Sequence, residues 1–89
     1  MAWNLEFSAE AEKDLGKLDP QVKSRILKFL FSRVGGSDDP SALGVRLVGS
    51  EHSGALRYRV GDYRIIANLY HDRLVVMVVA VGHRREVYR

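Results

Sequence analysis

Three arginines lie within one short segment that otherwise favours a β-strand, and their spacing suits the binding of phosphate. The segment LRYRVGDYRII, residues 56–66, carries Arg57, Arg59 and Arg64 among residue types that favour strands. Arginine presents a planar fork of N–H donors that matches phosphate oxygens, and it keeps its charge at neutral pH. A strand that only builds a core gains nothing from this charge. The segment therefore indicates a polyanionic partner.

A second group of chemically versatile side chains ends the sequence. The segment VGHRREVYR supplies an imidazole, a phenol and three guanidinium groups, from His83, Arg84, Arg85, Tyr88 and Arg89. Guanidinium groups bind phosphate, an aromatic ring stacks on bases, and histidine has a pKa suited to proton transfer. We expect this group to meet the first three arginines on one RNA-binding surface. For His83, a solvent-exposed residue at a strand end is an equally open interpretation.

The expected hairpin explains how the first three arginines would share a face. A two-residue connection at 61–62 is favoured because its glycine tolerates positive φ. Arg59 then faces Arg64, and Arg57 faces Ile66. Side chains alternate along a strand, so all three arginines project from one side of the sheet. A like-charged cross-strand pair destabilises a hairpin by about 0.2–1 kcal/mol. The stability of the fold therefore gives no reason for this pair.

The next hairpin determines where the final segment leaves the sheet. If the chain turns between Tyr70 and Arg73, Arg64 lies near Val79, and the final segment emerges beside the arginines. The alternative is purely structural, because charged strand faces are commonly just solvated. In that case the guanidinium groups splay into water or pair with nearby carboxylates, those of Glu51, Asp62 or Glu86.

The elements that position these residues alternate between strand and helix patterns. Residues 2–8 predict a strand with its large apolar side chains on one face. Ser8 is expected to cap a short helix that runs to about Leu18. A second helix should begin after Asp19, with proline in its first position, and end at the glycine pair 35–36.

The remainder predicts a long polar loop followed by three strands. The loop has room for one helical turn after Pro40, and the strands span about 55–60, 63–70 and 73–81. We therefore predict an α+β fold: an N-terminal strand, an antiparallel two-helix hairpin and a three-stranded antiparallel meander. Together they form one mainly antiparallel sheet with the helices on one face. The length of 89 residues suits a single domain over 1–89.

Composition narrows the class of protein. The chain has no cysteine, which excludes disulfides and thiolate metal sites, and it shows no cluster of metal ligands. Its start does not resemble a signal peptide, and its longest apolar run, LVVMVVAV, is too short to span a bilayer. We expect a cytoplasmic protein with no membrane association and no cofactor. Every lysine lies in the first half, so the basic side chains of the second half are arginines.

The run from LRYRVGDYRII to VGHRREVY resembles the RelE toxins of bacterial and archaeal toxin–antitoxin pairs, within the wider RelE/ParE group. The resemblance covers nearly the whole chain and implies a ribosome-dependent endoribonuclease that cleaves mRNA in the decoding site. The implied reaction is metal-independent attack of a ribose 2′-hydroxyl on the adjacent phosphate. The implied partners are the ribosome with its mRNA and a RelB-like antitoxin, with an acidic, partly disordered segment.

The same resemblance assigns roles by position. The catalytic positions of the family fall on Arg57, Arg59, Arg64, Arg84 and Tyr88, and Arg85 and Arg89 add to RNA binding. The best-studied family pattern has lysines where this chain has the first two arginines. Arginine does not deprotonate near neutral pH, so neither is expected to act as a general base. His83 is the candidate for proton transfer, and Glu86 more plausibly pairs with an arginine.

Two other functions remain open at this stage. One is a ParE-like toxin that inhibits DNA gyrase without cleaving RNA; such proteins usually lack the combined basic strand and Arg–Tyr tail. The other is a RelE homologue that binds RNA but cleaves it weakly because of its arginine substitutions. His52 and His71 lie in a loop and a turn of the expected fold, where we assign them no chemical role.

Overall fold

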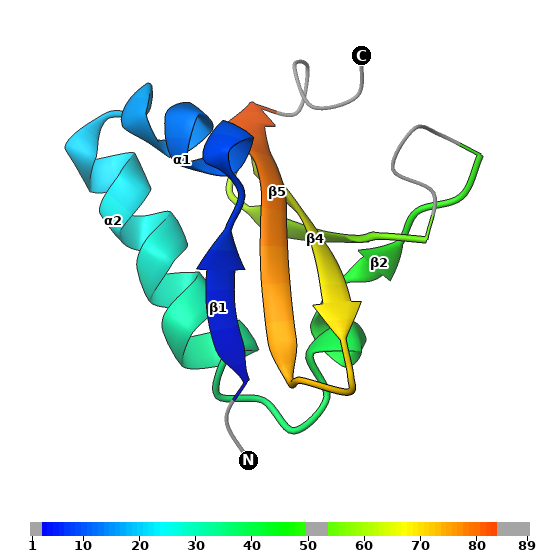
Figure 1. Cartoon of the computed structure of the whole chain (residues 1–89). Helices are drawn as coiled ribbons and strands as arrows, with labels where there is room; N and C mark the ends of the chain where they lie inside the picture. The colour runs from blue at the N-terminus through cyan, green and yellow to red at the C-terminus, as the bar shows by residue number, and fades with distance from the viewer. Residues whose placement is uncertain (1–2, 50–53, 84–89) are drawn as a thin grey trace.

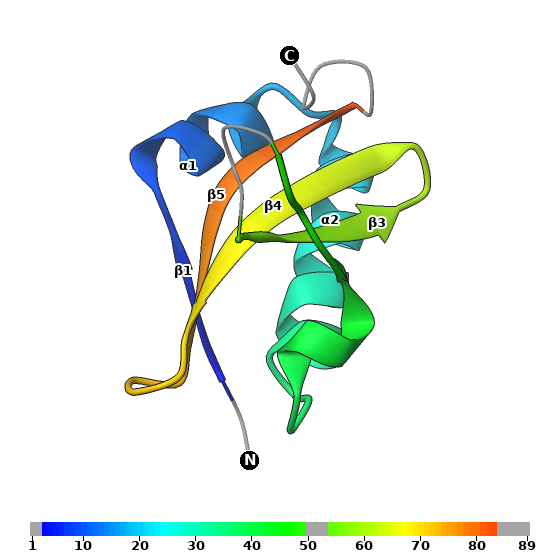
Figure 2. The ribbon, with the colours of Figure 1, turned by 90° about the vertical axis from the view of Figure 1, so that its right-hand side faces the viewer.

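A computed structural model of the chain describes residues 3–49 and 54–83. In chain order its elements are β1 (Asn4–Phe7), α1 (Ala9–Gly16), α2 (Pro20–Lys28), a π-helical segment (Phe29–Val34), a 3-10 helix (Pro40–Leu43), β2 (Val45–Arg46), β3 (Leu56–Val60), β4 (Tyr63–Tyr70) and β5 (Val75–His83). The strands form one sheet in the order β1-β5-β4-β3-β2 (Figure 1). Helices α1 and α2 pack on one face of it, and Figure 2 shows α2 behind β3 and β4.

The sheet is mainly antiparallel, as the sequence predicted. The pairs β2–β3, β3–β4 and β4–β5 are antiparallel, and only β1 runs parallel to its neighbour β5. The α+β architecture is thus confirmed, with one addition. Strand β2 lies within the expected loop. Its two residues are too few to form the alternating pattern by which a strand is predicted.

The helices begin where capping residues predict. The Ser8 side chain accepts a hydrogen bond of 3.0 Å from the backbone N–H of Ala11, and Pro20 occupies the first turn of α2. The π-helical segment continues α2, and the N–H of Gly35 donates to the carbonyl of Leu30 at 2.7 Å. The second helical stretch therefore ends at the predicted glycine pair. Helix α1 ends at Gly16, two residues before the predicted limit.

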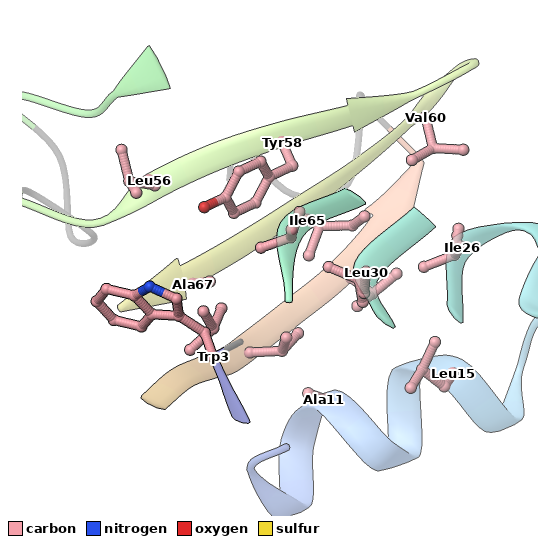
Figure 3. Packing of buried hydrophobic residues seen from close by; sticks show 14 residues of the cluster. Trp3, Ala11, Leu15, Ile26, Leu30, Leu56, Tyr58, Val60, Ile65 and Ala67 are labelled. Carbon is pink, nitrogen blue, oxygen red and sulfur yellow. The ribbon is translucent and has the colours of Figure 1, made fainter. Parts of the chain in front are cut away.

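The core lies between the helices and the sheet. In Figure 3, Leu15 of α1 and Ile26 of α2 point toward the strands. They pack with the alternate strand residues Leu56, Tyr58, Val60, Ile65, Ala67, Val76, Val78 and Val81. The predicted apolar face of the first strand also joins this core, through buried Trp3 and the partly buried Leu5 and Phe7. Burial of this face fixes which side chains of β3 and β4 must point the other way.

The β3–β4 hairpin has the predicted register. Gly61 adopts φ 59°, the positive value that its position in the two-residue turn requires. Arg59 pairs with Arg64, and Arg57 pairs with Ile66. All three arginines therefore project from the face of the sheet opposite the helices; we call this the arginine face.

The β4–β5 hairpin differs from the prediction. Tyr70 pairs with Val75, so four residues form the turn, and Leu74 adopts a positive φ of 52°. A register shift follows between Ile66 and Ala67, where Val79 has no partner in the ladder. Arg64 therefore faces Gly82, and the prediction that it lies near Val79 was wrong. The longer turn adds two residues and the bulge adds one.

None of the helices formed by residues 3–49 and 54–83 has the length and apolar character needed to cross a membrane.

Candidate nucleic-acid interface

The arginine face combines three guanidinium groups on two adjacent strands. Arg59 is exposed, and Arg57 and Arg64 are half-buried. One guanidinium nitrogen of Arg64 donates to the carbonyls of Gly61 and Tyr63, at 3.3 Å each. These contacts hold the side chain near the hairpin turn. The like-charged pair that the sequence predicted is therefore present, with part of each side chain open to solvent.

A buried apolar residue lies beneath these side chains. Ile66 projects to the arginine face yet is fully buried, between its cross-strand partners Arg57 and Ala80. Long arginine side chains cover apolar surface with their methylene stems while the charged heads stay in water. Burial of Ile66 on the side away from the helices is consistent with this arrangement. The arginine face thus has a buried apolar residue beneath its charged side chains.

Strand β3 is fixed on its outer side by the segment that precedes β2. The Tyr58 hydroxyl donates to the carbonyl of Pro40 at 2.8 Å, and burial raises the pKa of Tyr58 to about 12, with the negative charge of Asp39 adding to the effect. A methyl group placed on Gly44 would lie 2.9 Å from the carbonyl oxygen of Arg57 and 3.0 Å from the Tyr58 ring. Only glycine allows this close approach. The contact places β2 directly beside Arg57.

His83 lies on the other face of the sheet. It pairs with Tyr63, whose side chain points to the helices, and the two rings meet edge to face at 5.7 Å. The structure therefore does not place the imidazole on the arginine face, contrary to the expected convergence. The bulge at Val79 is the physical reason, because one extra residue moves every later side chain of β5 to the opposite face.

His83 instead borders a polar cleft that the sequence did not reveal. The cleft has a volume of about 330 Å³ and is lined by Asp14, Lys17, Leu18, Asp19, Tyr63, Val81, Gly82 and His83. A carboxylate oxygen of Asp14 accepts a hydrogen bond of 3.0 Å from the backbone N–H of Val81. This part of β5 extends beyond its pairing with β1, which ends at Phe7 and Val78. Asp14 thus satisfies a strand donor that lies beyond the pairing of β5 with β1.

The remaining predicted site residues fall outside the described part of the chain. These are Arg84, Arg85, Tyr88 and Arg89, and the proposed carboxylate partners Glu51 and Glu86 lie outside it as well. His71, in the turn between β4 and β5, packs edge to face against Trp3 at 5.2 Å. Within 3–49 and 54–83, no three His, Asp or Glu side chains are grouped so as to hold a metal ion.

Sequence comparisons place the chain among toxins. Residues 5–88 match the family described as ParE toxin of type II toxin-antitoxin system, parDE. Toxin RelG of Mycobacterium tuberculosis is 29% identical over 89 residues, which cover 100% of this chain and 99% of RelG. The mRNA interferase toxin RelE of Escherichia coli K12 is 29% identical over 90 residues, covering 99% of this chain and 92% of RelE.

Solved structures of such toxins share the fold. The toxin–antitoxin complex RelBE2 from Mycobacterium tuberculosis contains a chain with a TM-score of 0.84 and 26% identity, and the match covers 94% of this chain and 100% of that one. The isolated Escherichia coli RelE toxin gives a TM-score of 0.72 at 27% identity, covering 98% and 92% of the two chains.

Proposed function

Since the chain belongs to the ParE toxin family of type II toxin–antitoxin systems, within the wider RelE/ParE group, we propose that it is an endoribonuclease that cleaves mRNA on the ribosome. The observation that carries this proposal is the cross-strand pair of Arg59 and Arg64 on the arginine face. Relatives that match along nearly the whole chain are named mRNA interferases, which supports the same activity.

The proposed reaction forms one bond to phosphorus and breaks another. The ribose 2′-oxygen attacks the adjacent phosphate, its proton passes to a base, and the bond from phosphorus to the 5′-oxygen breaks. The leaving oxygen takes up a proton, which gives a 2′,3′-cyclic phosphate and a free 5′-hydroxyl. Negative charge builds up on the phosphorane oxygens. Fixed guanidinium donors stabilise that charge, so the reaction needs no metal ion.

We assign this stabilisation to the arginine face. Arg59 and Arg64 hold the phosphate from adjacent strands, and Arg57 extends the positive charge toward β2. In the same proposal Arg84 donates to the leaving oxygen and Tyr88 orients the 2′-hydroxyl or stacks on a base, while Arg85 and Arg89 bind RNA. We do not assign proton transfer to His83, because its ring packs against Tyr63 on the helix side.

We propose a RelB-like antitoxin as the second partner. Solved relatives of this fold include complexes of toxin and antitoxin, which supports the pairing. A surface of guanidinium groups favours an acidic segment that orders on binding. Such a segment would neutralise the toxin by occupying the positive charge that RNA otherwise uses.

The direct test is incubation of the purified protein with ribosomes programmed with a defined mRNA. We expect cleavage of the message within the decoding site, with a cyclic phosphate on the 5′ product. Cleavage should not need a metal ion bound to the toxin, so treating the toxin with EDTA and removing the EDTA before the assay should leave the cleavage rate unchanged. The proposal would be contradicted if the message stayed intact with a protein sample that binds the antitoxin in a separate assay and is therefore folded.

One observation favours a second candidate. The matching family is described by its ParE members, so inhibition of DNA gyrase remains an alternative activity for this fold. A supercoiling assay with purified gyrase distinguishes the two. Inhibited supercoiling together with intact RNA on programmed ribosomes would establish the second candidate in place of the first.

A further inference from the structure

A fourth arginine lies beside the turn that carries the cross-strand pair. Arg25 is an exposed residue of α2, and its guanidinium group lies against Gly61. A methyl group placed on Gly61 would be 3.4 Å from Nη1 of Arg25 and 3.8 Å from both Cζ and Nη2. The flat guanidinium group thus covers the turn from the helix side. These are ordinary van der Waals distances, so the guanidinium group packs against the turn without crowding it.

Arg64 contacts the same turn from the arginine face. Its Nη1 donates to the Gly61 carbonyl at 3.3 Å, so two guanidinium groups flank one glycine. Arg59 lies across from Arg64 in the same hairpin. Three positive charges therefore surround a two-residue turn whose single carboxylate is that of Asp62. Within 3–49 and 54–83, Arg25 forms no ion pair.

The space next to Arg25 can admit an anion. A cleft of about 210 Å³ is lined by Val22, Arg25, Val60, Gly61, Asp62 and Tyr63. This volume is several times the share of one liquid water, about 30 Å³, so a phosphate group fits. Fixed like charges repel one another, and a polyanion that crosses the turn would relieve that repulsion.

We propose that Arg25 binds a backbone phosphate of RNA next to the one held by Arg59 and Arg64. The RNA strand then passes from the arginine face over the Gly61–Asp62 turn toward the start of α2. This inference rests on the proposed function, since it extends the same RNA-binding surface. Arg25 acts in binding and touches no reacting atom.

The salt dependence of RNA binding tests this inference. The probe is a 12-nucleotide RNA with 2′-O-methyl groups, which binds but cannot be cleaved because its nucleophile is blocked. Each phosphate contact to a single strand contributes about 0.7 to the slope of log K against log salt. Arg25→Ala should lower the magnitude of that slope by about 0.7 and weaken binding about fivefold at 0.1 M salt.

Arg33→Ala is the matched control. Arg33 is also an exposed arginine of the same helical stretch, in its π-helical segment, and it does not line the cleft beside the turn. Its removal changes the net charge equally and should leave the slope within about 0.2 of the wild-type value. Arg25→Lys should retain most of the slope, because it keeps the charge. Unchanged urea midpoints would show that each variant folds.

The outcomes separate this inference from the proposed function. Equal slopes for Arg25→Ala, Arg33→Ala and the wild type would overturn the role of Arg25. A loss of antitoxin binding by Arg25→Ala with an unchanged RNA slope would overturn it too, and would assign the residue to a protein interface. If Arg59→Ala and Arg64→Ala also leave the slope unchanged, the proposed RNA surface itself fails.

Discussion

At the scale of single residues, the arrangement of charge is the informative feature. Arg59 and Arg64 face each other in a ladder where opposite charges or apolar pairs would stabilise the hairpin by about 0.2–1 kcal/mol. The hydrogen bonds from Arg64 to two turn carbonyls keep its side chain close to this pair. A bound phosphate would turn the repulsion into attraction. This repulsion is what leads us to propose that the pair binds an anion.

The proposed roles of Arg84 and Tyr88 lead to the first prediction at this scale. Arg84→Ala and Tyr88→Ala should each reduce message cleavage on programmed ribosomes by at least about tenfold, a typical loss for one transition-state contact. An unchanged urea midpoint serves as the control for correct folding. Full cleavage by the double variant would remove both residues from the mechanism.

At the scale of elements, Tyr58 joins the segment before β2 to β3. Its hydroxyl is buried and donates to the Pro40 carbonyl, so Tyr58→Phe leaves that carbonyl without its donor. We expect a loss of about 1–3 kcal/mol in the free energy of unfolding, measured with urea at pH 7. Leu69→Ile, a substitution of similar volume at a half-buried strand position, is the control and should cost less. Equal stability of Tyr58→Phe and the wild type would contradict the role of this hydrogen bond.

The same residue makes stability depend on pH in the alkaline range. Burial raises the pKa of Tyr58 to about 12, above its ordinary value of 10.0, so the folded state favours the protonated phenol. The resulting stability is fully present below pH 10 and is lost as the pH rises through 12. The free energy of unfolding of the wild type should therefore fall more steeply with pH in this window than that of Tyr58→Phe. Parallel curves would show that the phenol titrates alike in both states.

The elements also show what sequence reasoning captured. Ser8, Pro20 and the Gly61–Asp62 turn are local signals, and the structure places a cap, a helix start and a tight hairpin at them. Leu74 gives no such signal, because leucine rarely adopts the positive φ that it has here. The bulge at Val79 lies in a uniform apolar run, where no residue type marks it.

The bulge had the largest effect on the candidate site. In the predicted register, Val79 and His83 share the face of Arg64, whereas the observed register turns His83 toward Tyr63. The sequence therefore predicted the positions of the strand arginines correctly and the face of His83 incorrectly. Asp14 could not be assigned to that region from the sequence, because its contact with Val81 joins residues 67 positions apart.

At the scale of the whole molecule, the two faces of the sheet carry different side chains. One face packs against the helices and provides the core, as the position of α2 behind β3 and β4 in Figure 2 shows. The pairing register puts the arginines on the other face. Removing charge from the arginine face should therefore leave the core intact. The hairpin turn joins the two sides, because Arg25 approaches it from the helix and Arg64 from the sheet.

This separation predicts strong dependence of RNA binding on salt. The phosphate held by Arg59 and Arg64 and a second one contacted by Arg57 contribute about −1.4 to the slope of log K against log salt for a single strand. Titration of the 2′-O-methyl probe between 50 and about 300 mM potassium chloride measures it. A flat response would mean that binding does not use the arginine face.

The most direct test of the central claim is cleavage of message on programmed ribosomes by the double variant Arg59→Ala/Arg64→Ala, beside Arg33→Ala. If the arginine face stabilises the transition state, the cleavage rate of the double variant should fall at least about a hundredfold, because two charge contacts are lost. Its urea midpoint should stay at or above the wild-type value, because a repulsive pair is removed. Arg33→Ala should cleave normally. Cleavage at the wild-type rate by a folded double variant would contradict the claim that this face carries the reaction.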